Sequence, residues 1–252
     1  MKIDVLIVTY NSAKTLDRCL RSIKKEIPFN KILIGDGGSK DETIDIAEKH
    51  GAIVHLFLGK DNMIGRIRYR LAKIAETPWI IYVDSDVYLL PGWWKHMRKF
   101  IHPKVGMAMA HSIPTEILLP NYYKWRIRRF GFVTFGNTLC QRKIILECKR
   151  LENVHVGEDA IYAEHCRKNG YLVIPYPKPL VFHDRPERLN QAFYRWGRDM
   201  RIRREYVKFL LRSQIHLRNI IWYLLESGPC GKELLELIKC YLAMYRGFIE
   251  VR

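Results

Sequence analysis

The sequence has few cysteines and none of the spacings that mark a cysteine metal site or a redox pair. Its six cysteines are scattered along 252 residues without a C-x-x-C pair. Scattered thiols are typical of reducing compartments, where they stay unpaired and pack in the interior. Long apolar runs are missing too. No segment reaches the ~18 apolar residues of a membrane span, and none resembles a signal peptide. We therefore expect a cytoplasmic protein, possessing at most a peripheral attachment to the cytoplasmic face of the membrane.

Acidic residues are also scarce relative to basic ones. The chain carries 26 Asp and Glu against 43 Lys and Arg, a formal charge of +17. Basic residues are dense in KWRIRR at 124–129, and 14 of them lie in residues 185–252 against 7 acidic residues. Positive charge attracts phosphate, whether on a nucleic acid, an anionic lipid or a sugar nucleotide. The alternative is a solvated basic face without a specific partner.

Strand and helix patterns alternate through the first 110 residues. Short β-branched apolar runs predict strands at 3–8, 31–34, 52–57 and 79–83. Helical spacing predicts a helix from an N-cap at Asn11-Ser12 to Pro28, and further helices at 41–50 and 62–75. This alternation predicts βαβ units and an α/β fold with a mostly parallel central sheet flanked by helices.

The alternation loosens after Pro91. We expect helices at 92–101 and 158–169, and strands at 105–111, 132–140, 171–174 and 180–182. After Pro186 the pattern is helical throughout. The prediction is a domain of residues 1–185, with halves 1–110 and 111–185, followed by a basic amphipathic helical extension of residues 186–252.

Three polar clusters follow predicted strands directly. They are Thr9-Tyr10-Asn11, Asp36-Gly37-Gly38-Ser39 and Asp84-Ser85-Asp86. Parallel sheets bind ligands beyond the carboxyl ends of their strands, so these clusters predict one shared site. Two carboxylates in a D-x-D turn can converge on a hard cation, Mg²⁺ or Mn²⁺, which would neutralise a departing diphosphate. Alone, a D-x-D tripeptide is a weak signal.

The sequence resembles glycosyltransferase family 2, whose members are inverting enzymes with the GT-A fold. The resemblance covers about residues 1–185 and rests on four segments in the family's order. They read VLIVTYNSAKTLDRCLRSI, ILIGDGGSKDET, RYRLAKIAETPWIIYVDSDVYLLPGWW and VGEDAIYAEHCRKNGYLVIPY. The resemblance implies a nucleotide-sugar donor, with residues 1–110 as the nucleotide-sugar-binding half and residues 111–185 as the acceptor-side half.

Residue by residue, the resemblance implies a donor site. Tyr10 would lie beside the nucleobase, Asp36 would face the base and ribose, and Arg68 would reach the diphosphate. Gly37 stands where uridine-specific members have a second acid, so UDP- and GDP-linked sugars both remain open. The predicted nucleotide-sugar-binding residues are Thr9, Tyr10, Asn11, Asp36, Arg68, Asp84, Ser85, Asp86, Arg195 and Trp196.

Glu158-Asp159 resembles the family's E-D motif. The resemblance implies that Asp159 is the general base that takes a proton from an acceptor hydroxyl, with Glu158 orienting a substrate. Acids in a first helical turn also suit the helix dipole, which is the structural alternative. An acceptor that is already ionised, such as a lipid phosphate, would need no base. His183 is a further predicted ligand of the metal, beside Asp84 and Asp86.

The chain after residue 186 supplies the remaining predictions. Arg195 and Trp196 resemble a family signature with altered spacing, and we interpret them as a lid over donor or acceptor. Aromatic and basic residues on amphipathic helices predict an anionic membrane surface as a partner, unless they simply pack on the catalytic domain.

The leading hypothesis is a metal-dependent inverting glycosyltransferase. Its acceptor would be a glycan, a lipid-linked glycan or a polyprenyl phosphate, and no nucleic acid is expected as a partner. The alternatives are a nucleic-acid-binding protein, which leaves the four clustered acids unexplained, a sugar-1-phosphate nucleotidyltransferase and an inactive scaffold. A nucleotidyltransferase would need a glycine-rich basic loop after the first strand, where Thr9-Tyr10-Asn11-Ser12 stands.

Overall fold

A mixed sheet of eight strands organises the chain in the computed structural model, which describes residues 1–114, 133–155, 157–184 and 231–250 and scattered residues between 194 and 225. The strand order is β3-β2-β1-β4-β7-β6-β8-β5. The strands are β1 (Ile3–Thr9), β2 (Phe29–Asp36), β3 (Ile53–Leu56), β4 (Trp79–Asp84), β5 (Val87–Leu89), β6 (Val105–Pro114), β7 (Asn137–Gln141) and β8 (Leu172–His183). The neighbours among β1 to β4 pair in parallel, whereas β7 is antiparallel to both β4 and β6. The predicted α/β fold with a mostly parallel sheet is confirmed.

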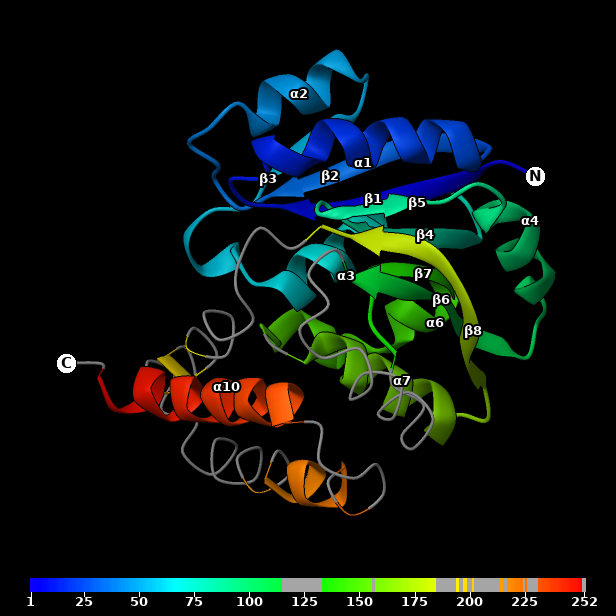
Figure 1. The fold of residues 1–252 in the computed structure, drawn as a ribbon. Coiled ribbons are helices and arrows are strands. Elements are labelled where there is room, and N and C mark those ends of the chain that lie inside the picture. The colour runs from blue at the N-terminus through cyan, green and yellow to red at the C-terminus, as the bar shows by residue number, and fades with distance from the viewer. Residues whose placement is uncertain are drawn as a thin grey trace. The chain divides into compact units, whose positions relative to one another are not determined.

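Helices cover both faces of this sheet (Figure 1). Helices α1 and α2 lie on one face, and α3, α6 and α7 lie on the other. The helices are α1 (Ala13–Glu26), α2 (Thr43–Lys49), α3 (Ile64–Ile74), α4 (Trp93–Met97), α6 (Arg142–Glu147), α7 (Glu158–Lys168) and α10 (Gly231–Ile249). Three short 3-10 turns are also described, η1 (Gly59–Asp61), η2 (Arg98–Phe100) and η3 (Lys149–Asn153).

The β-branched runs form strands because the sheet is buried on both faces. In β1, Val5 and Ile7 belong to the apolar cluster beneath α1, whereas Leu6 belongs to the cluster beneath α3. In β4, Ile81 and Tyr82 divide between the same two clusters. Side chains that alternate between two apolar layers require apolar residues at every position, which is the pattern of a parallel sheet interior.

The structure corrects two predictions about strands. The segments 171–174 and 180–182 are parts of one continuous strand, β8, because register shifts between Ala110 and Ser112 of β6 accommodate the proline-rich middle of β8. The strand predicted at 132–140 begins only at Asn137, and residue 132 lies outside the described part of the chain. Strand β5 was not predicted.

The chain divides into two compact units. The first comprises Met1–Thr115 and Gly131–Asp184, and the second comprises Glu116–Phe130 and Arg185–Arg252. In the second unit α10 confirms the helical extension, and a Cβ atom at Gly247 would lie 1.9 Å from the carbonyl oxygen of Tyr194. Glycine is therefore needed for this close approach. No helix among the described residues is long and apolar enough to cross a membrane.

Candidate active site

The three polar clusters meet at one edge of the sheet, as predicted. Strand β1 pairs in parallel with both β2 and β4, and the register places Thr9 opposite Asp36 and Val8 opposite Asp84. The polar residues that end these three strands therefore lie side by side at the carboxyl edge. This is the position at which open α/β sheets bind their ligands.

The loops after β1 and β2 are joined by hydrogen bonds. The Thr9 hydroxyl donates to Asp36 Oδ2 over 2.7 Å, and the backbone amides of Gly38 and Ser39 donate to Asp36 Oδ1. The Asn11 amide in turn donates to the Ser39 hydroxyl over 2.8 Å. Asp36 is fully buried, so its carboxylate organises this loop pair from beneath. Its predicted contact with a base or ribose stays a prediction.

Asn62 occupies the space beside Gly37, the residue that stands where the resembled family's uridine-specific members have a second acid. Its side-chain amide donates to the Gly37 carbonyl over 2.8 Å. A Cβ atom at Gly37 would lie 2.7 Å from Asn62 Oδ1, which is too close for any larger residue without movement of Asn62. Tyr10, on the neighbouring loop, is 60% exposed and so can offer its ring to a ligand. Asn62 was not predicted as a site residue, because it reads only as the start of a helix.

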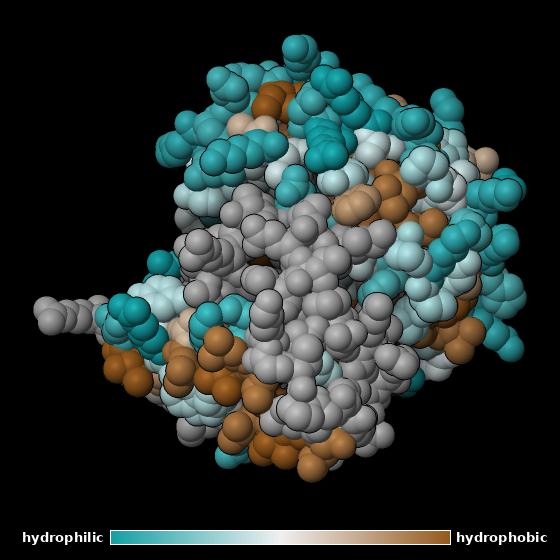
Figure 2. All heavy atoms as spheres, viewed as in Figure 1, coloured by the Kyte–Doolittle hydropathy of each residue, from teal (hydrophilic) through white to brown (hydrophobic). Residues whose placement is uncertain are grey.

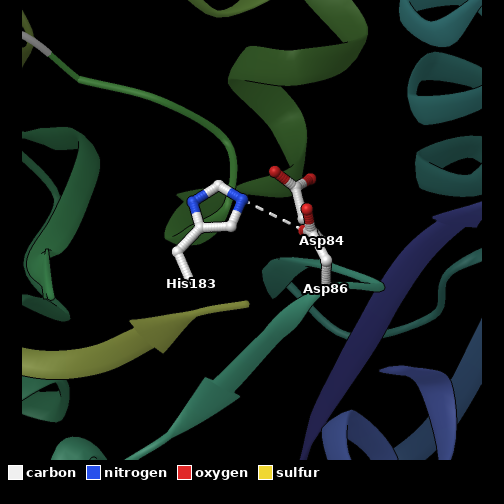
Figure 3. A group of neighbouring side chains, drawn as sticks. All are labelled: Asp84, Asp86 and His183. Atoms are coloured by element: carbon white, nitrogen blue, oxygen red, sulfur yellow. Dashed lines mark ion pairs between the residues drawn. The ribbon is translucent and has the colours of Figure 1, made fainter. Parts of the chain in front are cut away.

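Asp84, Asp86 and His183 converge, and one donor atom from each lies within 4.8 Å of the others (Figure 3). Asp84 is the last residue of β4 and Asp86 lies two residues further on, and His183 ends β8, whose pairing with β5 sets it opposite Val87. His183 Nε2 lies 3.1 Å from Asp86 Oδ1. Two carboxylates and an imidazole form a donor set that fits a divalent cation such as Mn²⁺. The structure brings the three predicted ligands together, and metal binding by them stays a prediction.

Ser85 contacts the start of α1. The predicted N-cap, Ser12, uses its carbonyl to accept from the amides of Thr15 and Leu16. Its side chain makes no capping hydrogen bond, and its hydroxyl lies 2.9 Å from the Ser85 hydroxyl instead. The hydroxyl pair fixes the middle of the D-x-D turn to the first helix, which holds the two carboxylates at the site.

Arg68 connects the two acidic clusters. It is 4% exposed on α3, and its Nη2 donates to Asp84 Oδ1 over 2.7 Å. Its Nε lies 3.4 Å from Oε1 of Glu158, in the first turn of α7. A single guanidinium thus bridges the D-x-D turn and the E-D motif, which are more than seventy residues apart in the sequence. The family resemblance implies a diphosphate contact for Arg68, whereas this bridge was not predicted.

The pKa values of Glu158 and Arg68 are both raised in this bridge, for different reasons. Burial raises the pKa of Glu158 to about 7, while the guanidinium of Arg68 opposes that rise. Burial alone would lower the pKa of Arg68, but Asp84 and Glu158 raise it, so Arg68 stays charged. Nη1 of Arg68 is buried and has no hydrogen-bond partner among the described residues. An unpaired buried donor at a cluster of acids is a position at which an anionic ligand could bind.

The remaining predicted residues divide into two groups. Asp159 is partly exposed in the first turn of α7, where its Oδ1 accepts from the Ala160 amide over 2.7 Å. Its proposed role as a base stays a prediction. Arg195 and Trp196 lie outside the described residues.

The sequence model of the family described as "Glycosyl transferase family 2" matches residues 4–150, more than half of the chain. The chain belongs to this family. The match covers β1 to β7, and with them the carboxyl edge, the D-x-D turn and Arg68. Membership favours the leading hypothesis over the nucleic-acid-binding and nucleotidyltransferase alternatives.

Curated relatives of this glycosyltransferase family 2 chain are much longer than the segment they share. The SPbeta prophage-derived glycosyltransferase SunS of Bacillus subtilis is 32% identical over 81 residues, which are 32% of this chain and 19% of SunS. The poly(ribitol-phosphate) beta-N-acetylglucosaminyltransferase TarS of Staphylococcus aureus is 31% identical over 108 residues, 40% of this chain and 19% of TarS. The similarity thus spans about a fifth of these two relatives.

Solved structures share the fold of this family 2 chain. Staphylococcus aureus TarS aligns with a TM-score of 0.57 at 19% identity, covering 80% of this chain and 39% of TarS. Glucosyl-3-phosphoglycerate synthase from Mycobacterium tuberculosis, in complex with Mn²⁺, UDP and glucosyl-3-phosphoglycerate, aligns with a TM-score of 0.56 at 15% identity, covering 76% of this chain and 74% of the synthase. These alignments support the GT-A fold.

Proposed function

We propose that this chain transfers a sugar from a nucleotide-sugar donor to an acceptor hydroxyl, with inversion at the anomeric carbon. The observation that carries the proposal is the convergence of Asp84, Asp86 and His183 at the carboxyl edge of the sheet. Through Arg68, this group is joined to the helix that begins with Glu158 and Asp159. A diphosphate site and an acceptor-side carboxylate are the two elements that such a transfer requires.

Asp84, Asp86 and His183 would hold a divalent cation, Mn²⁺ or Mg²⁺. A bound cation supplies Lewis-acid stabilisation of the departing nucleoside diphosphate. Two carboxylates leave most coordination positions of a hard cation open to diphosphate oxygens. The orphaned Nη1 of Arg68 supports an anionic ligand at the same place, because a diphosphate oxygen would satisfy it.

The proposal also concerns which nucleotide the donor sugar carries. UDP occupies the mycobacterial synthase of the same fold, which makes a UDP-sugar the first donor to test. In this chain Gly37, in the loop after β2, and the side-chain amide of Asn62, which follows η1, stand in place of a second carboxylate. An amide both donates and accepts hydrogen bonds, so a GDP-sugar is the main competing donor.

On the acceptor side, Asp159 would take the proton of the attacking hydroxyl. It lies in the first turn of α7, beside the buried Glu158 that Arg68 holds. A glycan or lipid-linked glycan would present such a hydroxyl, whereas a polyprenyl phosphate would not need the base. The cytoplasmic location stays a prediction.

A thermal-shift panel tests the proposal. UDP-, GDP-, dTDP- and CMP-sugars would each be added with and without Mn²⁺, and one class should raise the melting temperature only when Mn²⁺ is present. Release of the nucleoside diphosphate would then be measured with that donor. Asp86→Asn should abolish both effects, because the replacement removes a charged ligand.

Asp45→Asn is the matched control, because Asp45 is an exposed acid on α2 and should leave donor binding unchanged. A panel in which no nucleotide sugar stabilises the protein would contradict donor use. A shift of equal size without the metal would contradict the role of the cation.

A further inference from the structure

The solvent-facing side of α10 is aliphatic and basic. Its exposed side chains recur at helical spacing, so they occupy one stripe of about 100° around the helix axis. They are Leu235, Ile238, Lys239, Leu242, Arg246 and Ile249. Leu242 is 59% and Ile249 is 72% exposed. A helix face that meets only water is ordinarily polar. This stripe is therefore an unusual exposed apolar patch.

The opposite side of α10 supplies the packing of the second unit. Leu237 is buried in a cluster with Ile220 and Tyr223, and Met244 is fully buried in another cluster. Residues 217–223 are helical and lie against α10 through the first of these clusters. The exposed stripe therefore adds nothing to this packing.

The neighbouring helical residues repeat the pattern. Leu217, Ile221 and Leu225 are 44%, 47% and 77% exposed and recur every four residues, with Arg218 beside them. Figure 2 shows hydrophobic residues gathered over α10 on the face in view. Two packed helices thus both present aliphatic side chains and arginine or lysine to the solvent.

The charge of this unit identifies the kind of surface that would cover the stripes. Residues 116–130 and 185–252 together hold 18 Lys and Arg against 8 Asp and Glu, so they carry +10 of the chain's +17. On the stripe of α10 itself, the charged members are Lys239 and Arg246, and its acidic partners Glu236 and Glu250 lie at its margins. Lys239 and Arg246 are each paired with one of these glutamates, so the excess positive charge comes from the unit as a whole. An aliphatic stripe on a basic unit matches an anionic lipid surface, where the aliphatic groups enter the interface and the net charge attracts the headgroups.

We propose that the exposed stripe of α10, with Leu217, Ile221 and Leu225, binds the surface of an anionic membrane without crossing it. The apolar part supplies affinity that salt does not screen, and the net charge of the unit supplies affinity that salt weakens. This proposal does not rest on sugar transfer, because membrane binding can be measured without a donor.

Vesicle flotation tests the proposal with the full chain. The protein should float with vesicles of phosphatidylcholine and phosphatidylglycerol, bind phosphatidylcholine vesicles much more weakly, and lose part of its binding in high salt. The double variant Ile238→Gln, Leu242→Gln should bind the anionic vesicles at least about tenfold more weakly. Lys239→Gln with Arg246→Gln should reduce both the binding and its dependence on salt.

Leu172→Gln is the matched control, because Leu172 is 53% exposed on β8 in the first unit and should leave flotation unchanged. Circular dichroism and donor binding should be normal in all variants, since the altered side chains are exposed. Equal flotation of the double variant and the original chain would overturn the proposal. The proposal would also be overturned if the original chain forms a dimer and does not bind vesicles, and if the double variant is monomeric. A second copy of the chain would then cover the stripe.

Discussion

Nη2 of Arg68 donates to Oδ1 of Asp84 over 2.7 Å, and this contact orients a carboxylate of the candidate metal site from the interior. The same guanidinium faces Glu158, so one buried cation balances two acids from different parts of the chain. A buried ion pair contributes little net stability when complete, but the loss of one partner leaves an uncompensated charge. Arg68 is therefore expected to matter for both the fold and the site.

Arg68→Met should lower the free energy of unfolding by about 3–5 kcal/mol, because it removes the buried cation that the buried Glu158 and the partly buried Asp84 share. Urea denaturation at constant pH measures this change. Arg70→Met is the control on the same helix, since Arg70 pairs with Asp61 at the surface and its loss should cost at most about 1 kcal/mol. Equal effects of the two variants would show that the bridge is not buried as described.

Glu158 should make the protein less stable as the pH rises. Burial raises the pKa of Glu158 to about 7, whereas the unfolded chain has the ordinary value of 4.5. Between these values the folded protein keeps a proton that the unfolded chain releases, so stability falls as pH rises and levels off above about 7. The difference corresponds to roughly 3 kcal/mol. Glu158→Gln should remove this fall, measured by urea denaturation from pH 5 to pH 8.

The control for that pH dependence is Glu164→Gln on the same helix. A side-chain hydrogen bond from Lys168 lowers the pKa of the exposed Glu164, so its contribution is present at high pH and lost as the pH falls. The sign is opposite to that of Glu158, and Glu164→Gln should therefore keep the fall between pH 5 and 8. A Glu158→Gln variant with the same pH profile as the original chain would contradict the raised pKa.

His183 should influence which cation binds. Its imidazole nitrogen suits transition metals such as Mn²⁺, whereas Mg²⁺ prefers oxygen ligands. His183→Gln should weaken Mn²⁺ binding by about tenfold or more and affect Mg²⁺ less, as measured by calorimetric titration of the metal alone. His96→Gln is the control, because His96 contacts Tyr176 and Lys178 away from the acids and should leave both affinities unchanged. Equal losses for both cations would argue against direct ligation by His183.

Local pattern was enough to predict the strands of the first half and the edge at which the polar clusters meet. Alternating burial on two sheet faces leaves a strong signal in β1 and β4, and parallel register then brings Thr9, Asp36 and Asp84 together. The unity of β8 was not predictable, because its prolines indicate a break that only the register shift against β6 removes. Long-range pairing decides such cases, and one sequence carries little information about it.

The candidate site was predictable where the chemistry of a single residue type indicates its role. It was less predictable where the role depends on a contact with a residue that is distant in the sequence. Asp84 and Asp86 lie at the end of a strand, and the metal-binding chemistry of imidazole singled out His183. The bridge formed by Arg68 depends on the packing of α3 against the start of α7, which no spacing in the sequence reveals. The side chain of Ser12 also escaped prediction, because Ser85 offers it a partner that replaces the usual cap.

Gly37 and Asn62 should be energetically coupled, which bears on why glycine stands where uridine-specific family members have a second acid. A Cβ atom at Gly37 would lie 2.7 Å from Asn62 Oδ1, so Gly37→Ala should turn the Asn62 amide away from the Gly37 carbonyl and destabilise the protein by about 0.5–1.5 kcal/mol. Asn62→Ala should relieve most of that cost in the double variant, giving a coupling of at least about 0.5 kcal/mol in urea denaturation. Gly38→Ala is the control, because the φ of +91° at Gly38 strains any larger residue whether or not Asn62 is present. Additive effects of Gly37→Ala and Asn62→Ala would show that Asn62 does not exclude a side chain from position 37.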